Sequence, residues 1–186
     1  MVGVTDVGKN MADIAAAWRR VERVLRRSPK TGLQADAPAM AVWNGDTKVA
    51  CTHANGTTLV TDMPVEMGGD GTGVTPGWLM RAGLASCATT LIAMNAAVAG
   101  IRLTTLEVVA SSRSDTRGLF GMTDTDGKRV AAGPCNIQLQ IRIAAADGTS
   151  PQVLRALVER SHDCSPVACA IQESIPVELR IHCELD

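Results

Sequence analysis

The stretch TPGWLMRAGLASCATTLIAMNAAVAG, residues 75–100, decides the fold of this chain. Thr75 is a favoured N-cap residue, Pro76 fits the first helical position, and Gly100 fits the helix stop. Residues 82–99 carry no charge and are long enough to span a bilayer, but they are rich in alanine. They also hold four polar side chains, Ser86, Thr89, Thr90 and Asn95. We therefore predict a helix from 76 to 99 that is buried in a protein core.

Three segments after this helix predict β-strands. Residues 136–143 and 177–184 alternate apolar and polar side chains, which indicates half-buried strands of an antiparallel sheet. Residues 104–112 form a further strand with weaker alternation. Between the last two strands, Ser-Pro steps at 150–151 and 165–166 each start a helix. Strands at both ends and helices in the middle predict an α+β fold.

The segment before the central helix predicts short strands joined by turns. The pairs 45–46 (Gly-Asp) and 55–56 (Asn-Gly) are turn signals. They separate three predicted strands, at 39–44, 48–53 and 57–60. The glycine-rich run 66–73 matches neither nucleotide-binding fingerprint, so we predict a flexible loop leading into the helix.

The N-terminal part of the chain predicts an amphipathic helix over 10–27. Its apolar residues fall at spacings of three and four: Met11, Ile14, Trp18, Val21 and Leu25. Five arginines cluster near its end, where cations are favoured: Arg19, Arg20, Arg23, Arg26 and Arg27. We divide the chain into an N-terminal helical arm and linker, 1–37, and one domain, 38–186.

Composition restricts the functions that are open to the chain. The net charge of −1 gives no general attraction to nucleic acid or to an anionic membrane. Aromatic side chains make up 2% of the residues, which argues against a surface that stacks bases. The first twenty residues lack a secretory signal, so we expect a cytoplasmic protein whose six cysteines are reduced. No cofactor is indicated.

The central helix and two later segments resemble proteins of the OsmC/Ohr family. The run 75–108 resembles the family's central helix and following strand, with a proline near the start and small residues before Cys87. The run 114–121 resembles the loop after that strand, and 163–179 resembles the second cysteine-proline segment and the last strand. In element order the resemblance covers roughly residues 38–184.

The resemblance implies curved antiparallel sheets packed on long central helices, in an intertwined homodimer. It also implies oxidative-stress defence, in which a pair of cysteines reduces organic hydroperoxides or hydrogen peroxide. Cys87 matches the cysteine that attacks the peroxide. Gly77 stands where the peroxide-reducing branches have a glutamate, and the first hairpin turn offers Lys48 where they have an arginine. Ser165 stands where the family's second cysteine usually precedes the proline, with Cys164 one residue earlier.

Peroxide reduction requires a thiolate, and an ordinary cysteine is only a few per cent thiolate at neutral pH. Cys87 lies about three turns into its helix, beyond the reach of the helix dipole, so a cation from elsewhere is needed. Three basic residues are candidates for that cation: Lys48, Arg117 and Arg81. Arg81, six residues before Cys87, lies off its helix face.

Cys164 is the candidate partner thiol, because it precedes a helix start that favours an anion. Cys169, within the same helix, is the substitute. A disulfide formed in this way needs an external thiol as its reductant.

Two other functions stay open. A metal site could use His162, Cys164, Cys169, His182 and Cys183, although their spacings fit no common zinc pattern. The other is a non-catalytic dimer of the OsmC fold that binds a small apolar ligand, in which Cys87 is a packing residue.

Overall fold

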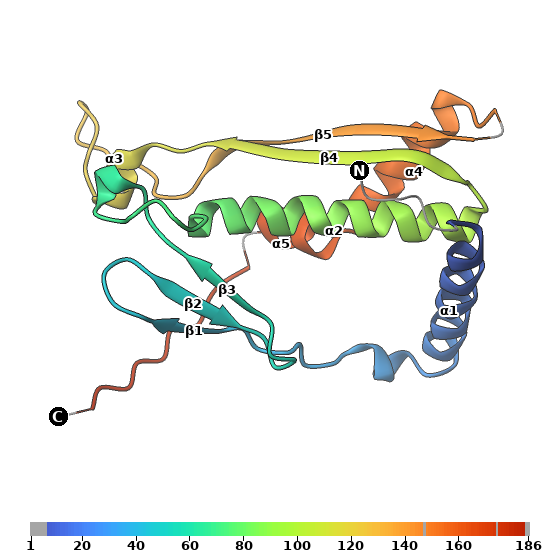
Figure 1. Ribbon diagram of the computed structural model, residues 1–186, viewed down its shortest axis with the longest axis horizontal. Helices are drawn as coiled ribbons and strands as arrows, with labels where there is room; N and C mark the ends of the chain where they lie inside the picture. Colours follow the sequence, from blue (N-terminus) through green and yellow to red (C-terminus); the bar gives the residue numbers. More distant parts are fainter. Residues whose placement is uncertain (1–6, 147, 174, 185–186) are drawn as a thin grey trace.

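The computed structural model describes residues 7–146, 148–173 and 175–184. In chain order its elements are α1 (Val7–Arg27), η1 (Pro29–Gly32), β1 (Met40–Trp43), β2 (Val49–Thr52), β3 (Thr58–Thr61), η2 (Val65–Met67), α2 (Pro76–Ala99), β4 (Leu103–Arg113), α3 (Thr116–Leu119), β5 (Cys135–Ala145), α4 (Pro151–Asp163) and α5 (Pro166–Gln172). Both sheets are antiparallel, which confirms the predicted α+β class. The long helix α2 runs along the β4–β5 sheet, and the β1–β3 sheet lies apart from both (Figure 1).

Helix α2 begins and ends where the sequence predicts. The Thr75 side chain accepts a hydrogen bond from the Trp78 backbone N–H at 3.2 Å, and Pro76 occupies the first turn. Gly100 ends the helix in the left-handed region at φ 69°, a conformation that costs glycine little. Local capping therefore sets both ends, whatever the helix packs against.

One face of α2 forms the main core with the β4–β5 sheet and α4. Ile92 and Ala96 of α2 and Leu157 of α4 are each 1% exposed. Partly buried apolar side chains from both strands surround them, among them Leu103, Leu106, Ile141 and Ile143. The ladder shifts register near each of its ends, and such irregularities increase the local twist of a sheet. The predicted strands 104–112 and 136–143 are thus confirmed as parts of β4 and β5.

The first three strands form a separate antiparallel sheet in the order β1–β2–β3. Both predicted turns are present, with Gly45, Asp46 and Gly56 at positive φ. The sheet leaves large apolar side chains exposed, and Trp43 on β1 is 71% exposed. Its ladders join its own three strands, and Thr61 at the end of β3 also bridges to Val74, just before α2.

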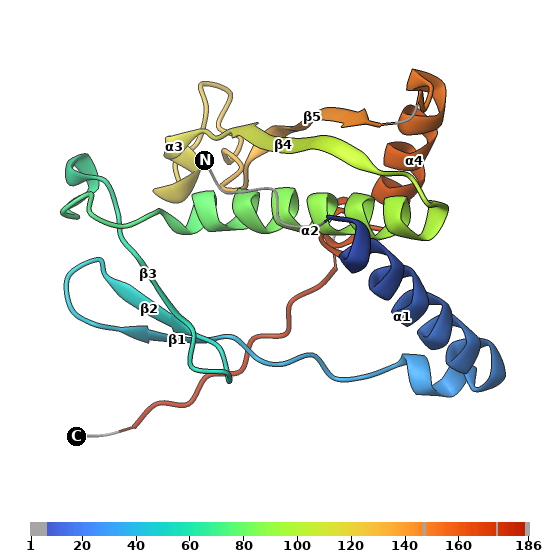
Figure 2. The same cartoon turned by 45° about the vertical axis from the view of Figure 1, so that its right-hand side comes forward.

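The strand predicted over 177–184 is wrong for this single chain. The segment is extended and leads away from α5 in the direction of the β1–β3 sheet (Figures 1 and 2). It belongs to neither sheet in the part of the chain that the structure describes. Val177, Leu179 and Ile181 are 92%, 80% and 72% exposed. The alternation is real, but a strand needs a neighbour to pair with, and one copy of the chain provides none.

Helix α1 confirms the predicted N-terminal helix. It packs near the C-terminal end of α2 (Figure 2). There the Arg19 guanidinium donates to the Val98 carbonyl oxygen at 3.5 Å. Ala15 is buried, whereas Val21 and Val24 further along α1 are 54% and 52% exposed. The division of the chain at residue 37 stays a prediction.

Within the described residues, α2 is the one helix long and apolar enough to cross a membrane by length and composition. Its most apolar window has a mean hydropathy of 1.5, and 28% of that window is buried. Core helices of water-soluble proteins pass the same test. Helix α2 also contacts α1, β4, α4 and α5, yet a large part of its apolar surface is uncovered in one chain.

Candidate active site

Cys87 is half-buried in the middle of α2. Two neighbours on the same helix, Leu84 and Ala88, are 3% and 4% exposed. The Ser165 hydroxyl at the start of α5 donates a hydrogen bond to the Cys87 sulfur, with 3.3 Å between Oγ and Sγ. Ser165 is 0% exposed. The fold therefore joins two residues 78 positions apart in a polar contact that is shielded from water on the serine side.

Ser165 is the site residue that the sequence does not identify. The sequence predicts it as a helix cap, and it does precede Pro166 at the N-cap of α5. Its side chain makes no capping hydrogen bond, in contrast to Thr75 and Ser150, which cap α2 and α4. The one available signal is its position, directly before the proline, where the family usually has its second cysteine.

The two candidate partner cysteines lie before and after Ser165 in the chain, Cys164 at the end of α4 and Cys169 within α5. Cys164 is exposed at the C-cap of α4. Cys169 is half-buried, and its thiol donates to the Asp163 carbonyl oxygen at 3.5 Å. The structure thus brings Ser165 to Cys87, and Cys164 stays a predicted partner, one residue away along the chain.

Each of the three cations suggested for Cys87 contacts another side chain. The Lys48 ammonium lies 2.5 Å from the Asp70 carboxylate, and that hydrogen bond raises the pKa of Lys48. The Arg81 guanidinium donates to the Ser112 hydroxyl at 3.3 Å.

The third candidate, Arg117, is paired with a neighbour at the start of its own short helix. Its guanidinium donates to the Asp115 carboxylate at 2.6 Å, and this hydrogen bond lowers the pKa of Asp115 and raises that of Arg117. All three cations thus bind other groups, whereas the hydroxyl of Ser165 donates to the Cys87 sulfur.

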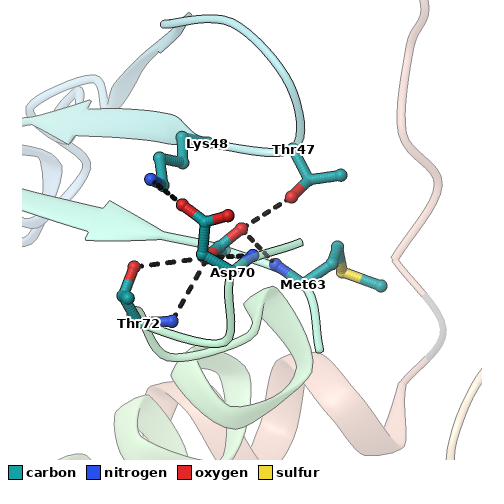
Figure 3. Close-up of polar contacts among 6 residues, drawn as sticks. Thr47, Lys48, Met63, Asp70 and Thr72 are labelled. Atoms are coloured by element: carbon teal, nitrogen blue, oxygen red, sulfur yellow. Dashed lines mark hydrogen bonds and ion pairs between the residues drawn. The ribbon is translucent and has the colours of Figure 1, made fainter. Parts of the chain in front are cut away.

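The loop that leads into α2 is organised by Asp62, which is 1% exposed. Figure 3 labels the residues around its carboxylate, Thr47, Met63, Asp70 and Thr72. Its carboxylate accepts hydrogen bonds from the Thr47 hydroxyl at 2.6 Å and from the backbone N–H groups of Met63, Asp70 and Thr72. The Thr47 hydrogen bond is the largest cause that lowers the pKa of Asp62 to about 2. The backbone donors of the glycine-rich run thus bind a carboxylate of the chain itself.

We expect Asp62 to make the fold acid-sensitive. Its folded-state pKa of about 2 lies below the ordinary aspartate value of 3.8, so its stabilisation is complete above that value and is lost as the pH falls through 2. At neutral pH Asp62→Asn should lower the melting temperature by roughly 5 °C or more, because a neutral amide replaces the carboxylate that accepts these hydrogen bonds. In thermal unfolding experiments the difference in melting temperature between wild type and Asp62→Asn should become smaller as the pH approaches 2.

Asp36→Asn, in the exposed linker, is the matched control and should follow the wild type. A constant difference between wild type and Asp62→Asn over the whole acid range would contradict the role assigned to the Asp62 carboxylate.

An open apolar pocket of about 400 Å³ is lined by residues of α2, β5, α4 and α5, and neither Cys87 nor Ser165 is among them. Leu84, one helical turn before Cys87, forms part of its wall, as do Ala168 and Ile171 of α5. Glu159, His162 and Gln172 add polar groups, and His162 and Gln172 lie 3.4 Å apart through their side-chain nitrogens. This surface can hold a small apolar group, and its link to Cys87 is Leu84 on the same helix.

The described residues do not assemble the metal site that the sequence left open. No three His, Cys, Asp or Glu side chains among them lie close enough together to hold a metal ion. His182 and Cys183 lie in the extended C-terminal segment, after α5, whereas His162 and Cys164 lie at the end of α4. No observation of the site favours a metal function.

Solved structures of similar fold come from several bacteria. An OsmC-like protein from Mycoplasma pneumoniae has a TM-score of 0.62 at 18% identity, with 75% of this chain and 89% of that chain covered. An OsmC-like protein of unknown function from Vibrio cholerae has a TM-score of 0.57 at 13% identity, covering 78% and 96%. An organic hydroperoxide resistance protein from Elizabethkingia anophelis, solved with thiocyanate bound, has a TM-score of 0.56 at 18% identity, covering 75% and 90%. At these identities the likeness shows the fold.

The sequence itself provides the family assignment. No functionally curated protein matches it significantly. A family model described as OsmC-like protein matches residues 69–180, which is more than half of the chain and includes α2, the β4–β5 sheet, α4 and α5. The chain therefore belongs to the OsmC-like protein family.

Proposed function

We propose that this protein is a thiol peroxidase that reduces organic hydroperoxides or hydrogen peroxide, with Cys87 as the attacking residue. The observation that carries the proposal is the half-buried Cys87 sulfur, which accepts a hydrogen bond from the fully buried Ser165. The relative from Elizabethkingia anophelis is described as an organic hydroperoxide resistance protein, which supports a peroxide substrate and a role in oxidative-stress defence.

The first step breaks the O–O bond of the peroxide. The Cys87 thiolate attacks the terminal oxygen of ROOH, forms a sulfenic acid and releases RO⁻, which takes up a proton to give ROH. For hydrogen peroxide the released product is water. The sulfur is oxidised by two electrons and the peroxide is reduced by two, so no bound redox cofactor takes part.

In the second step, the Cys164 thiol attacks the sulfur of the sulfenic acid, forms a disulfide and releases water. An external thiol then reduces the disulfide, and the cytoplasm is the compartment where such thiols are kept reduced. Cys164 lies at the junction between α4 and α5, outside both helices, so a local turn of this junction can bring its thiol toward Cys87.

Peroxide consumption by the purified, prereduced protein tests the proposal. Stopped-flow mixing with an organic hydroperoxide and with hydrogen peroxide should show rapid loss of one peroxide per chain together with two thiols, which peptide mapping should assign to Cys87 and Cys164. Peroxide loss no faster than in buffer would exclude the activity.

A second function, binding of a small apolar ligand without catalysis, is favoured by two observations. The pocket that Leu84 helps to line has mainly apolar walls, and the three candidate cations are bound to other groups. This function predicts that apolar compounds bind to the fully reduced protein and raise its melting temperature, while peroxide is not consumed.

We expect mild peroxide treatment to join Cys87 to Cys164. A sulfenic acid is captured by the thiol that can reach it with disulfide geometry, and Cys164 is freer to move than Cys169, which α5 holds in place. Non-reducing digestion and mass spectrometry should find this bridge, and Cys164→Ser should remove it and allow Cys87 to pass to sulfinic acid. A bridge from Cys87 to Cys169 would reverse the assignment, and Cys169→Ser is the matched control.

We further propose that the working form is a homodimer. Most of the apolar window of α2 is uncovered in one chain, and the C-terminal segment carries an unpaired row of apolar side chains. The β1–β3 sheet adds further exposed apolar residues, including Met40 and Trp43. A second copy could cover these surfaces and pair with the extended C-terminal segment.

A further inference from the structure

We infer that Ser165 is a positioning residue for Cys87: its buried hydroxyl donates to the sulfur, favours the thiolate and fixes the direction in which the sulfur points. The inference rests on the proposed function and adds a residue that the chain carries in place of a second cysteine. The contact between Oγ and Sγ is 3.3 Å, within hydrogen-bonding distance for a hydroxyl and a sulfur.

The local structure of α5 shows that this hydroxyl is directed to the sulfur. A serine at an N-cap ordinarily accepts a hydrogen bond from the backbone of the first turn, as Ser150 does for Val153 at the start of α4. Ser165 gives up that contact, although its backbone carbonyl still accepts from the Cys169 N–H at 2.9 Å. Its hydrogen bond to sulfur therefore replaces a cap.

The hydrogen bond from Ser165 favours one of the two forms of the Cys87 side chain, the thiolate over the thiol. A thiol sulfur is a weak acceptor, whereas a thiolate accepts strongly, so a fixed O–H donor stabilises the charged form more than the neutral one. Ser165 is 0% exposed, so water does not compete for its hydroxyl. The same donor holds the sulfur in one orientation.

Residue 165 also determines what lies beside the sulfur after oxidation. A hydroxyl cannot form a disulfide with the sulfenic acid of Cys87, whereas a thiol at this position could. Ser165 can therefore activate the Cys87 sulfur but cannot react with its sulfenic acid. That reaction requires Cys164 or an external thiol.

Alkylation of Cys87 by iodoacetamide tests the inference independently of peroxide chemistry. The rate is followed from about pH 5 to about pH 9 by peptide mapping, in wild type, Ser165→Ala and Ser161→Ala. Ser165→Ala removes the donor and should slow alkylation near neutral pH about tenfold, with the whole pH profile displaced to the alkaline side.

Ser161→Ala is the matched control. Ser161 is also buried, at 1% exposed, and it accepts a hydrogen bond from the Asn95 side chain of α2 at 3.0 Å, while its own hydroxyl donates to the Leu157 carbonyl. The variant therefore loses an equally buried hydroxyl that also contacts α2, but one without a hydrogen bond to Cys87. Its alkylation profile should match that of the wild type.

Unchanged alkylation of Cys87 in Ser165→Ala over the whole pH range would overturn the inference. If Ser165→Ala does not fold, Ser165→Cys takes its place, because a thiol has nearly the same shape and is a weaker donor. In the reduced state Ser165→Cys should slow alkylation of Cys87, and after peroxide treatment the introduced thiol should form a disulfide with Cys87. A wild-type alkylation profile without that disulfide would also overturn the inference.

Failure of the proposed function gives a different result. In that case the wild type does not consume peroxide, yet Ser165→Ala still displaces the alkylation profile of Cys87. Peroxide consumption therefore tests the proposed function, and the alkylation profile of Cys87 tests the role of Ser165.

Discussion

Replacement of Cys87 by serine is expected to reduce peroxide consumption to the rate seen without protein. A serine hydroxyl stays protonated at neutral pH and cannot accept the peroxide oxygen as a thiolate does, so the first step has no nucleophile. The substitution is nearly isosteric, and Cys87 is only half-buried, so the fold should remain intact by circular dichroism and thermal unfolding. Stopped-flow mixing with an organic hydroperoxide measures the loss.

The other cysteines provide matched controls for this experiment. Cys51 is half-buried on β2 and Cys135 is exposed at the start of β5, so their serine variants should consume peroxide like the wild type. Limited alkylation at about pH 6 should also label Cys87 before Cys51, Cys135 and Cys183. Full activity of Cys87→Ser, or labelling of Cys87 after the others, would instead make Cys87 a packing residue of α2.

Substitution of two apolar residues in the C-terminal segment is expected to weaken the proposed dimer by a large factor. Leu179 and Ile181 are 80% and 72% exposed in one chain, and the dimer is expected to bury them. A buried residue of this size contributes roughly 1.5–3 kcal/mol, so each change to lysine should weaken association by about tenfold or more. Light scattering and sedimentation over a range of concentrations measure the shift from a particle of two chains toward the 19.5 kDa of one.

Glu178→Gln is the control, because Glu178 lies on the opposite face of the extended segment and pairs with Arg180 at 3.0 Å. It should associate like the wild type. A wild-type protein that stays at the mass of one chain at micromolar concentration would remove the dimer proposal. A dimer equally tight in Leu179→Lys would place the interface elsewhere, with the surface of α2 as the next candidate.

Much of the fold follows from local patterns. Thr75, Pro76 and Gly100 predict the ends of α2, because capping involves groups within one turn of each other. The alternation of 136–143 predicts part of β5, because one face of that strand meets the core and the other meets water. The sequence does not predict the short α3 helix, Thr116–Leu119, since four residues give too little periodicity for a helical pattern to be recognised.

The candidate site could be predicted only in part. The family resemblance identifies Cys87, and α5 begins at the predicted Ser-Pro step. The cations could not be assigned, because nothing in the sequence shows that Lys48 pairs with Asp70 or that Arg81 reaches Ser112. Such pairs depend on where loops and strands cross in space.

The sequence by itself determined the family, the class of fold, the helix ends and the cysteine on the central helix, because these features depend on residues that are near one another along the chain. Only the tertiary structure decided that Ser165 meets Cys87 across 78 residues and that its hydroxyl contacts the sulfur in place of the helix cap. It also decided that the alternating C-terminal segment has no strand to pair with among the described residues of one copy of the chain. These contacts join residues that are distant along the chain, so they depend on how the elements pack and not on local sequence patterns.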